Sequence, residues 1–118
     1  MGRERRLARQ DTTIIEGCLR AAVEGPFFSD RLFHTLFGLE RSEVAAVLQQ
    51  WPEVQDTETA YLAINNAINN LLGYPHRATE EDWDAFVPVS REELRLFFSK
   101  WRGRRRPDSA QGFFDAME

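Results

Sequence analysis

The chain has 118 residues, of which 42% are hydrophobic and 29% are charged, and its formal net charge is −4 at pH 7. This length and composition are typical of one globular domain with an apolar core, and they exclude an intrinsically disordered chain. No apolar run approaches the ~20 residues of a membrane-spanning helix, so we expect no membrane association.

Apolar residues recur at helical spacing almost throughout, whereas the strict alternation typical of strands is scarce. A first helix is predicted over residues 11–24, where Gly25 and Pro26 end it because proline disfavours helix in the residue before it. A second, short helix is predicted over residues 29–37, with a serine or aspartate as its cap. Gly38 then lies just past its end.

Two further helices follow in the middle of the chain. The third is predicted over residues 41–50 and is closed by Pro52. The fourth is predicted over residues 57–72 and is stopped by Gly73. This fourth segment is the longest uninterrupted helical pattern, so we expect it to form the centre of the fold.

Capping signals predict two more helices. Residues 79–82 read Thr-Glu-Glu-Asp, and such acids favour the positive end of a helix dipole, so a short fifth helix should start there. Pro88 breaks the chain again. Residues 90–93 read Ser-Arg-Glu-Glu, which is a capping box. The sixth helix should run from there to about Arg102, with Gly103 after it.

These patterns predict an all-α fold, a compact bundle of five to six short helices packed around the central helix at about residues 57–72. We divide the chain into a basic N-terminal arm over residues 1–10 and a helical domain over residues 11–103. A flexible C-terminal tail follows over residues 104–118 and carries a Phe-Phe motif.

Four asparagines in the fourth helix are unusual, because asparagine competes for backbone hydrogen bonds in a helix interior. At 100° per residue, Asn65 and Asn69 fall at the edge of the apolar arc, and Asn66 and Asn70 fall on the far side, facing water. Asn65 and Asn69 either bind a neighbouring loop or line a polar pocket or partner-facing seam. Such a pocket, with Trp51 nearby, would make the protein a small-ligand binder.

Residues 30–49 partly resemble a helix-turn-helix. Gly38 stands where the turn glycine would be, but His34 stands where that pattern has a small residue. Arg41 and its neighbours would lie on the helix that reads DNA. Because the body of the chain is acidic, we expect two helices that merely pack at an angle more than a DNA-reading element.

Positive charge is concentrated near the chain ends. Residues 1–10 hold four Arg and one Glu, and residues 100–106 hold five Lys or Arg, whereas residues 11–99 hold 15 acids and six Arg. Such runs are either simply solvated or steer an acidic partner, and Arg beside an aromatic ring also suits single-stranded nucleic acid. The candidate residues in the second run are Trp101, Arg104, Arg105 and Arg106.

The Phe-Phe motif consists of Phe113 and Phe114, after a segment rich in turn-forming residues. The pair either folds back to cover an apolar groove or docks into another molecule. Folding back is favoured, because an exposed pair of Phe side chains promotes aggregation.

Residues with catalytic chemistry are few and separate. His34 and His76 fall in different elements without ligand partners at helical spacing, and Cys18 lies on an apolar stripe, which is typical of an unreactive thiol. We therefore expect no catalytic site, no metal and no cofactor. The single cysteine also excludes a disulfide framework, and the N-terminal arginines lack the apolar stretch of a secretory signal, so we expect a cytoplasmic protein.

The leading hypothesis is a small, non-catalytic protein-interaction or regulatory module whose partner is another protein. The alternatives are a nucleic-acid-binding protein that uses the basic arms or residues 30–49, and the small-ligand binder. The sequence leaves the oligomeric state open.

Overall fold

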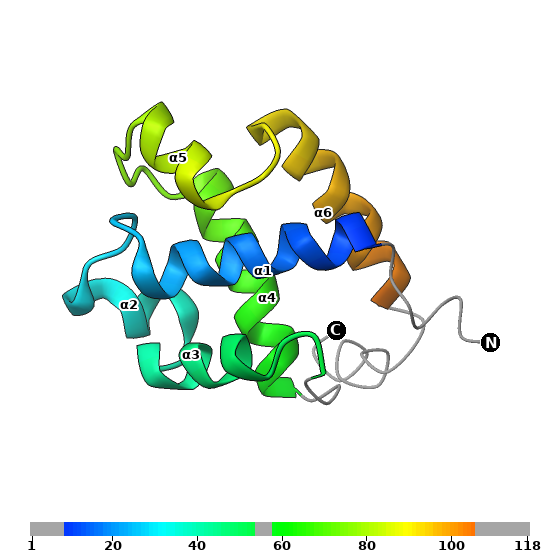
Figure 1. The fold of residues 1–118 in the computed structure, drawn as a ribbon. Helices are drawn as coiled ribbons and strands as arrows, with labels where there is room; N and C mark the ends of the chain where they lie inside the picture. Colours follow the sequence, from blue (N-terminus) through cyan, green and yellow to red (C-terminus); the bar gives the residue numbers. More distant parts are fainter. Residues whose placement is uncertain (1–8, 54–57, 106–118) are drawn as a thin grey trace.

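The computed structural model describes residues 9–53 and 58–105, and it gives side chains for residues 10–53 and 58–102. The described residues form six α-helices and no strand, which confirms the predicted all-α class (Figure 1). The helices are α1 (Arg9–Glu24), α2 (Asp30–Phe37), α3 (Arg41–Gln50), α4 (Glu58–Gly73), α5 (Glu80–Phe86) and α6 (Arg91–Arg105). No helix in the described part of the chain is both long and apolar enough to cross a bilayer.

The ends of α2 follow from its sequence. The Ser29 hydroxyl accepts a hydrogen bond from the Leu32 N–H at 3.4 Å and caps the first turn. At the other end Gly38 has a φ of +71°, in the left-handed region that glycine adopts without strain, and its N–H donates to the His34 carbonyl at 2.7 Å. Both cap residues are where the sequence predicts them.

Reciprocal capping boxes start the last two helices. The Thr79 hydroxyl accepts from the Asp82 N–H, and the Asp82 carboxylate accepts from the Thr79 N–H, both at 3.1 Å. Ser90 and Glu93 form the same pair of bonds at 3.1 and 3.0 Å. Each box satisfies two backbone donors that a bare helix end would leave unpaired.

The end of α6 differs from the prediction. The helix continues through Gly103 to Arg105, so Gly103 is not its stop, and Arg104 belongs to the helix instead of the tail. A glycine inside a helix costs about 1 kcal/mol relative to alanine.

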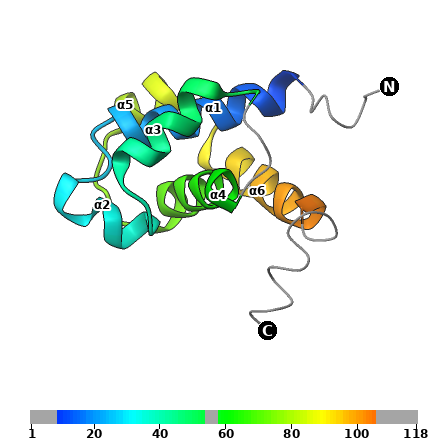
Figure 2. The same cartoon turned by 90° about the horizontal axis from the view of Figure 1, so that it is seen from below.

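Helix α4 lies at the centre of the bundle, as predicted. It contacts α1, α2, α3 and α6, and Figure 2 shows α1 and α3 on one side of it and α6 beside it. Its buried side chains span about 180° of the helix at 100° per residue, whereas a surface helix buries a stripe of about 100°. They are Ala60, Tyr61, Ala63, Ile64, Ala67, Ile68, Asn70 and Leu71.

Helix α1 lies across α4 and also presses against the segment that follows α5 (Figure 1). A Cβ atom at Gly17 would stand 2.4 Å from the Phe86 carbonyl oxygen and 2.7 Å from Pro88 Cδ. Side-chain carbons do not approach backbone oxygens so closely. Glycine at this position therefore allows α1 and the α5–α6 connection to come together.

Candidate interaction surface

The start of α6 is fixed to α5 by one tryptophan. The Trp83 Nε1–H donates to the Val89 carbonyl at 2.8 Å, directly before the helix begins. The Arg91 guanidinium lies over the same indole ring, with Cζ 4.3 Å from the ring centre. Such a cation–π contact adds to the capping box, so the first turn of α6 has a defined position.

The inner face of α6 packs on α4. Its buried side chains are Leu94, Phe97, Phe98 and Trp101. The Trp101 ring stacks on Tyr61 of α4, with 5.1 Å between ring centres and 15° between ring planes. This aromatic contact holds α6 against the central helix and leaves the opposite side of α6 outside the core.

The outer face of α6 carries Leu96, whose side chain is 61% exposed. The other large apolar side chain exposed among the described residues is Leu32 of α2, at 36%. The polar residues that are also exposed on α6 are Glu92, Glu93, Arg95, Ser99, Lys100 and Arg102. The most exposed large apolar side chain of the described chain is thus surrounded by charged ones.

Helical spacing orders this surface. At 100° per residue, Glu92 and Lys100 lie about 40° to either side of Leu96. Ser99 follows Leu96 by three residues and lies about 60° from it, on the side of Glu92. We call Glu92, Leu96, Ser99 and Lys100 the α6 outer stripe. Sequence reasoning missed Leu96, although the signal was present, because the same wheel that turns Leu94 and Trp101 inward turns Leu96 outward.

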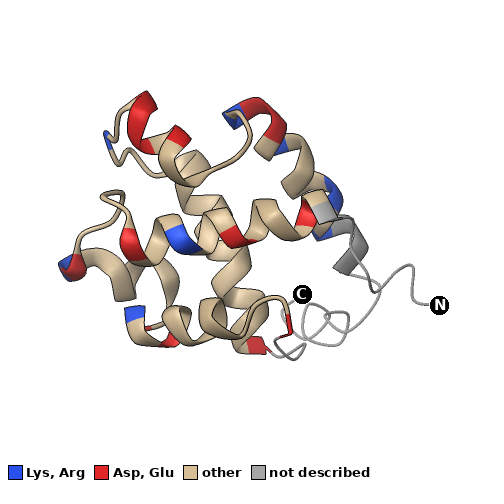
Figure 3. Cartoon of the chain, viewed as in Figure 1, with Lys and Arg blue, Asp and Glu red and all other residues tan. Residues whose placement is uncertain are grey.

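The charges of the fold are arranged by region. Figure 3 shows acidic residues on α5 and at the start of α6, and basic residues toward the end of α6. Helix α1 begins at Arg9 and α6 ends at Arg105, and both helix ends lie at the same end of the molecule in Figures 1 and 2. The two basic segments of the sequence therefore join the fold at one end.

Trp101 does not belong to the exposed surface. Its side chain is 4% exposed, and it lies between Tyr61 and the Phe98 ring, whose centre is 6.2 Å away. A ring packed in this way does not offer a face to a nucleotide base. Arg102 lies over Phe98, with Cζ 5.1 Å from the ring centre, at the edge of this aromatic group.

The expectation that Asn66 and Asn70 face water is wrong. The Asn66 side-chain amide donates to the Phe37 carbonyl at 2.8 Å, and that of Asn70 donates to the Leu36 carbonyl at 3.1 Å. These carbonyls belong to the last residues of α2, which have no partner within their own helix. Asn70 is only 9% exposed.

The physical reason is a stripe of small residues. The predicted arc counted only the large apolar side chains, but Ala60, Ala63 and Ala67 are also buried and extend the packed face around to Asn70. Alanine has no bulk to signal burial, yet its small side chain lets α2 approach α4 closely. The amides that the sequence placed in water then meet the end of α2.

The candidates Asn65 and Asn69 have different surroundings. Asn69 is exposed, whereas Asn65 is half-buried and donates from its amide to the Asn66 side-chain oxygen at 3.1 Å. The Asn65 Oδ1 is buried and has no hydrogen-bond partner among the described residues. Trp51 donates from Nε1 to the Thr12 carbonyl of α1 at 3.1 Å, so this indole ties α3 to α1.

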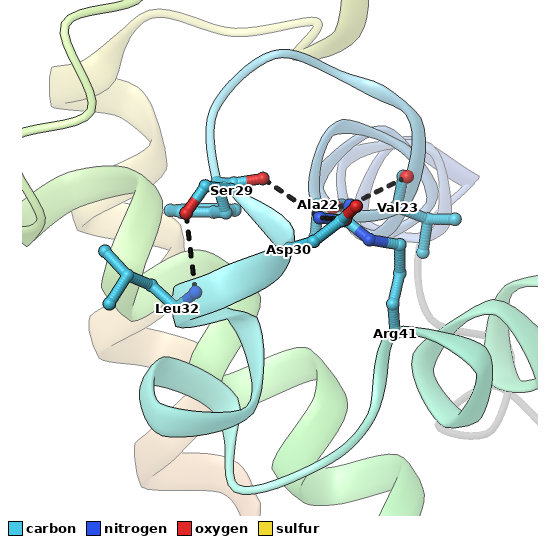
Figure 4. Close-up of polar contacts among 7 residues, drawn as sticks. Ala22, Val23, Ser29, Asp30, Leu32 and Arg41 are labelled. Carbon is cyan, nitrogen blue, oxygen red and sulfur yellow. Dashed lines mark hydrogen bonds and ion pairs between the residues drawn. The ribbon is translucent and has the colours of Figure 1, made fainter.

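Arg41 joins three helices instead of facing outward from a reading helix. Its Nη1 donates to the Ala22 and Val23 carbonyls at the end of α1, each at 3.0 Å (Figure 4). Its Nη2 donates to the Phe28 carbonyl at 3.0 Å and forms an ion pair with Asp30 at 2.8 Å. The arginine that the helix-turn-helix comparison places on the DNA-reading helix is thus bonded within the fold.

The nucleophilic and imidazole side chains are placed separately. Cys18 is buried in the core, and this burial strongly raises the pKa of its thiol. His76 accepts from the Ala78 N–H at Nδ1 and, in that tautomer, donates from Nε2 to the Leu71 carbonyl at 3.1 Å. His34 is exposed, 3.9 Å from the Glu40 carboxylate. No group of three or more potential metal ligands occurs in the part of the chain that the structure describes.

The remaining candidates, Arg106, Phe113 and Phe114, lie outside the described residues, as do the side chains of Arg104 and Arg105. The chain matches no protein-family model, and no curated protein or solved structure is significantly similar to it.

Proposed function

We infer that the protein is an interaction module that binds another protein chain through the outer face of α6. The observation that carries this proposal is the 61% exposure of Leu96 between charged residues of both signs. Protein-binding sites commonly combine an apolar contact with a polar rim that excludes mismatched partners. The remaining faces of the helix are committed to packing, so the outer face is free to serve as a contact surface.

Mixed charge favours a protein partner over nucleic acid. Glu92 and Glu93 share the outer face with Lys100, and carboxylates repel phosphate. The burial of Trp101 and the internal bonds of Arg41 remove the two side chains on which the nucleic-acid alternative depended most. That alternative now depends on the basic segments alone, and DNA retention that falls steeply with salt would support it. The small-ligand alternative would need a pocket at Asn65.

The cytoplasm remains the location that we propose, because a single buried cysteine suits a reducing compartment. If the protein has a regulatory role, it would act by covering the surface of the partner that α6 binds.

Site-specific photocrosslinking in cells tests the proposal. A photoreactive residue at Leu96 or at Ser99 should form a discrete protein adduct, because both positions lie on the α6 outer stripe. The matched control is Leu32, an exposed leucine on α2. Adducts that form equally well from Leu32, or from none of the three positions, would exclude α6 as the contact surface.

Substitution then separates binding from folding. Leu96→Asp should abolish the adduct formed from Ser99, because a carboxylate at the centre of the surface must be desolvated on contact. Its melting temperature should fall by only a few degrees, since aspartate has a lower helix propensity than leucine but exposed substitutions change stability by only about 0.5 kcal/mol. Loss of the adduct together with a large loss of stability would mean that Leu96 acts in folding.

A further inference from the structure

We propose that the partner of the α6 outer stripe is a second copy of this chain, with the two α6 helices antiparallel about a two-fold axis at Leu96. This inference depends on the proposed function, because it uses the same surface. It adds the identity of the partner and the direction of the contact.

The charge pattern of the stripe is complementary to itself. Glu92 and Lys100 each lie four residues from Leu96, which is about 6 Å along the helix on opposite sides. In an antiparallel pair, Glu92 of one copy faces Lys100 of the other, and the two-fold axis generates the same pair again. A parallel pair would place each charge against its own kind, so the pattern selects the antiparallel arrangement.

The apolar and small residues also suit a helix pair. Glu92, Leu96 and Ser99 are spaced by four and three residues, which is the spacing of a coiled-coil seam. Leu96 of each copy meets its equivalent at the axis. Ser99 has little side-chain bulk, so it does not hold the two helices apart.

The flanking cations limit the affinity. Arg95 lies about 100° from Leu96, at the edge of the contact, where the arginines of the two copies would repel each other. Arg102 turns back over Phe98 and contributes less. One helix face is smaller than the ~800 Å² per partner of a standard interface, so we expect a weak dimer with a dissociation constant on the order of 100 μM.

Cysteine crosslinking tests the geometry directly. Cys18 is buried, and it is the single cysteine of the sequence, so a thiol introduced by Leu96→Cys is the reactive one. Because Leu96 lies on the proposed axis, mild oxidation should convert this variant to a disulfide-linked dimer. Leu32→Cys, on α2, is the matched control and should dimerise at least ~10-fold more slowly, since its thiols meet only by random collision.

Charge reversal tests the pairing. Sedimentation velocity between about 10 μM and about 1 mM protein should show a monomer–dimer equilibrium that weakens as salt is added. Glu92→Lys and Lys100→Glu should each weaken the dimer, and the double variant should restore it, because both ion pairs re-form with reversed signs. Arg31→Glu on α2, outside the stripe, should leave the equilibrium unchanged.

The outcomes separate this inference from the proposed function. A wild-type protein that stays monomeric at the highest concentration, with no faster disulfide formation at Leu96 than at Leu32, overturns the second-copy proposal. If the photocrosslinks in cells then identify a different protein, the proposed function stands without it. If the crosslinks at Leu96 and Ser99 give no adduct at all, both proposals fail.

Discussion

At the scale of single residues, neighbouring asparagines of α4 have opposite environments. Asn69 is exposed, whereas Asn70 is buried and donates to the Leu36 carbonyl and to the Asn66 carbonyl, at 3.1 and 2.8 Å. Helical periodicity separates the two positions by 100° but does not say which side another helix will cover. The buried alanines of α4 mark the side that α2 covers. Alanine is only weakly apolar, so the sequence pattern did not indicate that they are buried.

Asn70→Ala should therefore destabilise the protein, whereas Asn69→Ala should not. Removing the Asn70 amide leaves the Leu36 carbonyl without that donor, at an expected cost of about 1–3 kcal/mol. Alanine at position 69 has a better helix propensity and loses no described contact, so its effect should be near zero or slightly stabilising. Urea unfolding of both variants measures the difference, and equal effects would contradict the assignment.

Cys18 gives the stability of the fold a dependence on alkaline pH. Burial raises the pKa of this thiol well above its value in the unfolded chain, which is about 8.5. Above that pH the unfolded state releases the proton while the folded state retains it. The free energy of unfolding should therefore fall as pH rises above about 8.5, by up to about 1.4 kcal/mol per pH unit from this group.

Urea unfolding between about pH 7 and pH 10 checks this slope. Cys18→Ala serves as the control, because it removes the thiol and retains every other ionisable group of the chain. The wild-type curve should fall more steeply than the control curve. Parallel curves would show that the thiol does not contribute.

At the scale of helices, sequence signals that act over a few residues were sufficient to predict the ends of most elements. The caps at Ser29, Thr79 and Ser90 depend on hydrogen bonds within one turn, and the structure contains each of them. The predicted end of α6 was wrong, because a glycine alone does not stop a helix. Whether a helix continues through a glycine depends on the residues that follow it.

The role of Gly17 could not be predicted from the local sequence, because it depends on how closely the α5–α6 connection approaches α1. Glycine inside a helix would ordinarily be improved by alanine by up to about 1 kcal/mol. Gly17→Ala should instead destabilise by about 1–3 kcal/mol, because the added methyl would overlap the Phe86 carbonyl at 2.4 Å.

Gly73, the last residue of α4, is the matched control, because a Cβ added there meets no atom within 4 Å apart from its chain neighbours and the backbone of its own helix. Gly73→Ala should be neutral or stabilising. The two melting temperatures, measured side by side, should shift in opposite directions. A stabilising Gly17→Ala would show that α1 does not approach the α5–α6 connection so closely.

At the scale of the whole molecule, the all-α class and the central position of α4 could be predicted, because both follow from helical periodicity and segment length. The long-range contacts could not. Arg41 binds carbonyls 18 and 19 residues earlier in the chain, and no local pattern encodes that distance. The α6 outer stripe could be predicted only in part. The helix wheel shows that its residues point away from the inner face of α6, but only the packing of α6 on α4 shows that no other described helix covers them.

Arg41→Lys tests how much the contacts of this one side chain with α1 and α2 contribute to the stability of the bundle. Lysine keeps the charge but lacks the planar fork that donates to the Ala22, Val23 and Phe28 carbonyls together. We expect a loss of about 2–3 kcal/mol in the free energy of unfolding, since hydrogen bonds from a charged donor contribute about 1.5–3 kcal/mol each and lysine retains some of them. A lysine variant of full stability in urea would reduce the role of Arg41 to its charge alone.

The amides of Asn66 and Asn70 have a consequence for the uniqueness of the fold. Alanine and leucine stripes tolerate small rotations of one helix against another, since apolar contacts have no fixed direction. The two amides, by contrast, reach the carbonyls of consecutive α2 residues at one rotational setting of α4. A rotation of α4 by one residue in one direction would place Ala67 and Leu71 against these carbonyls, whereas rotation in the other direction would bring Asn65 and Asn69 there. The amide pair therefore disfavours the first of these rotations, as buried polar residues fix the register of helix pairs.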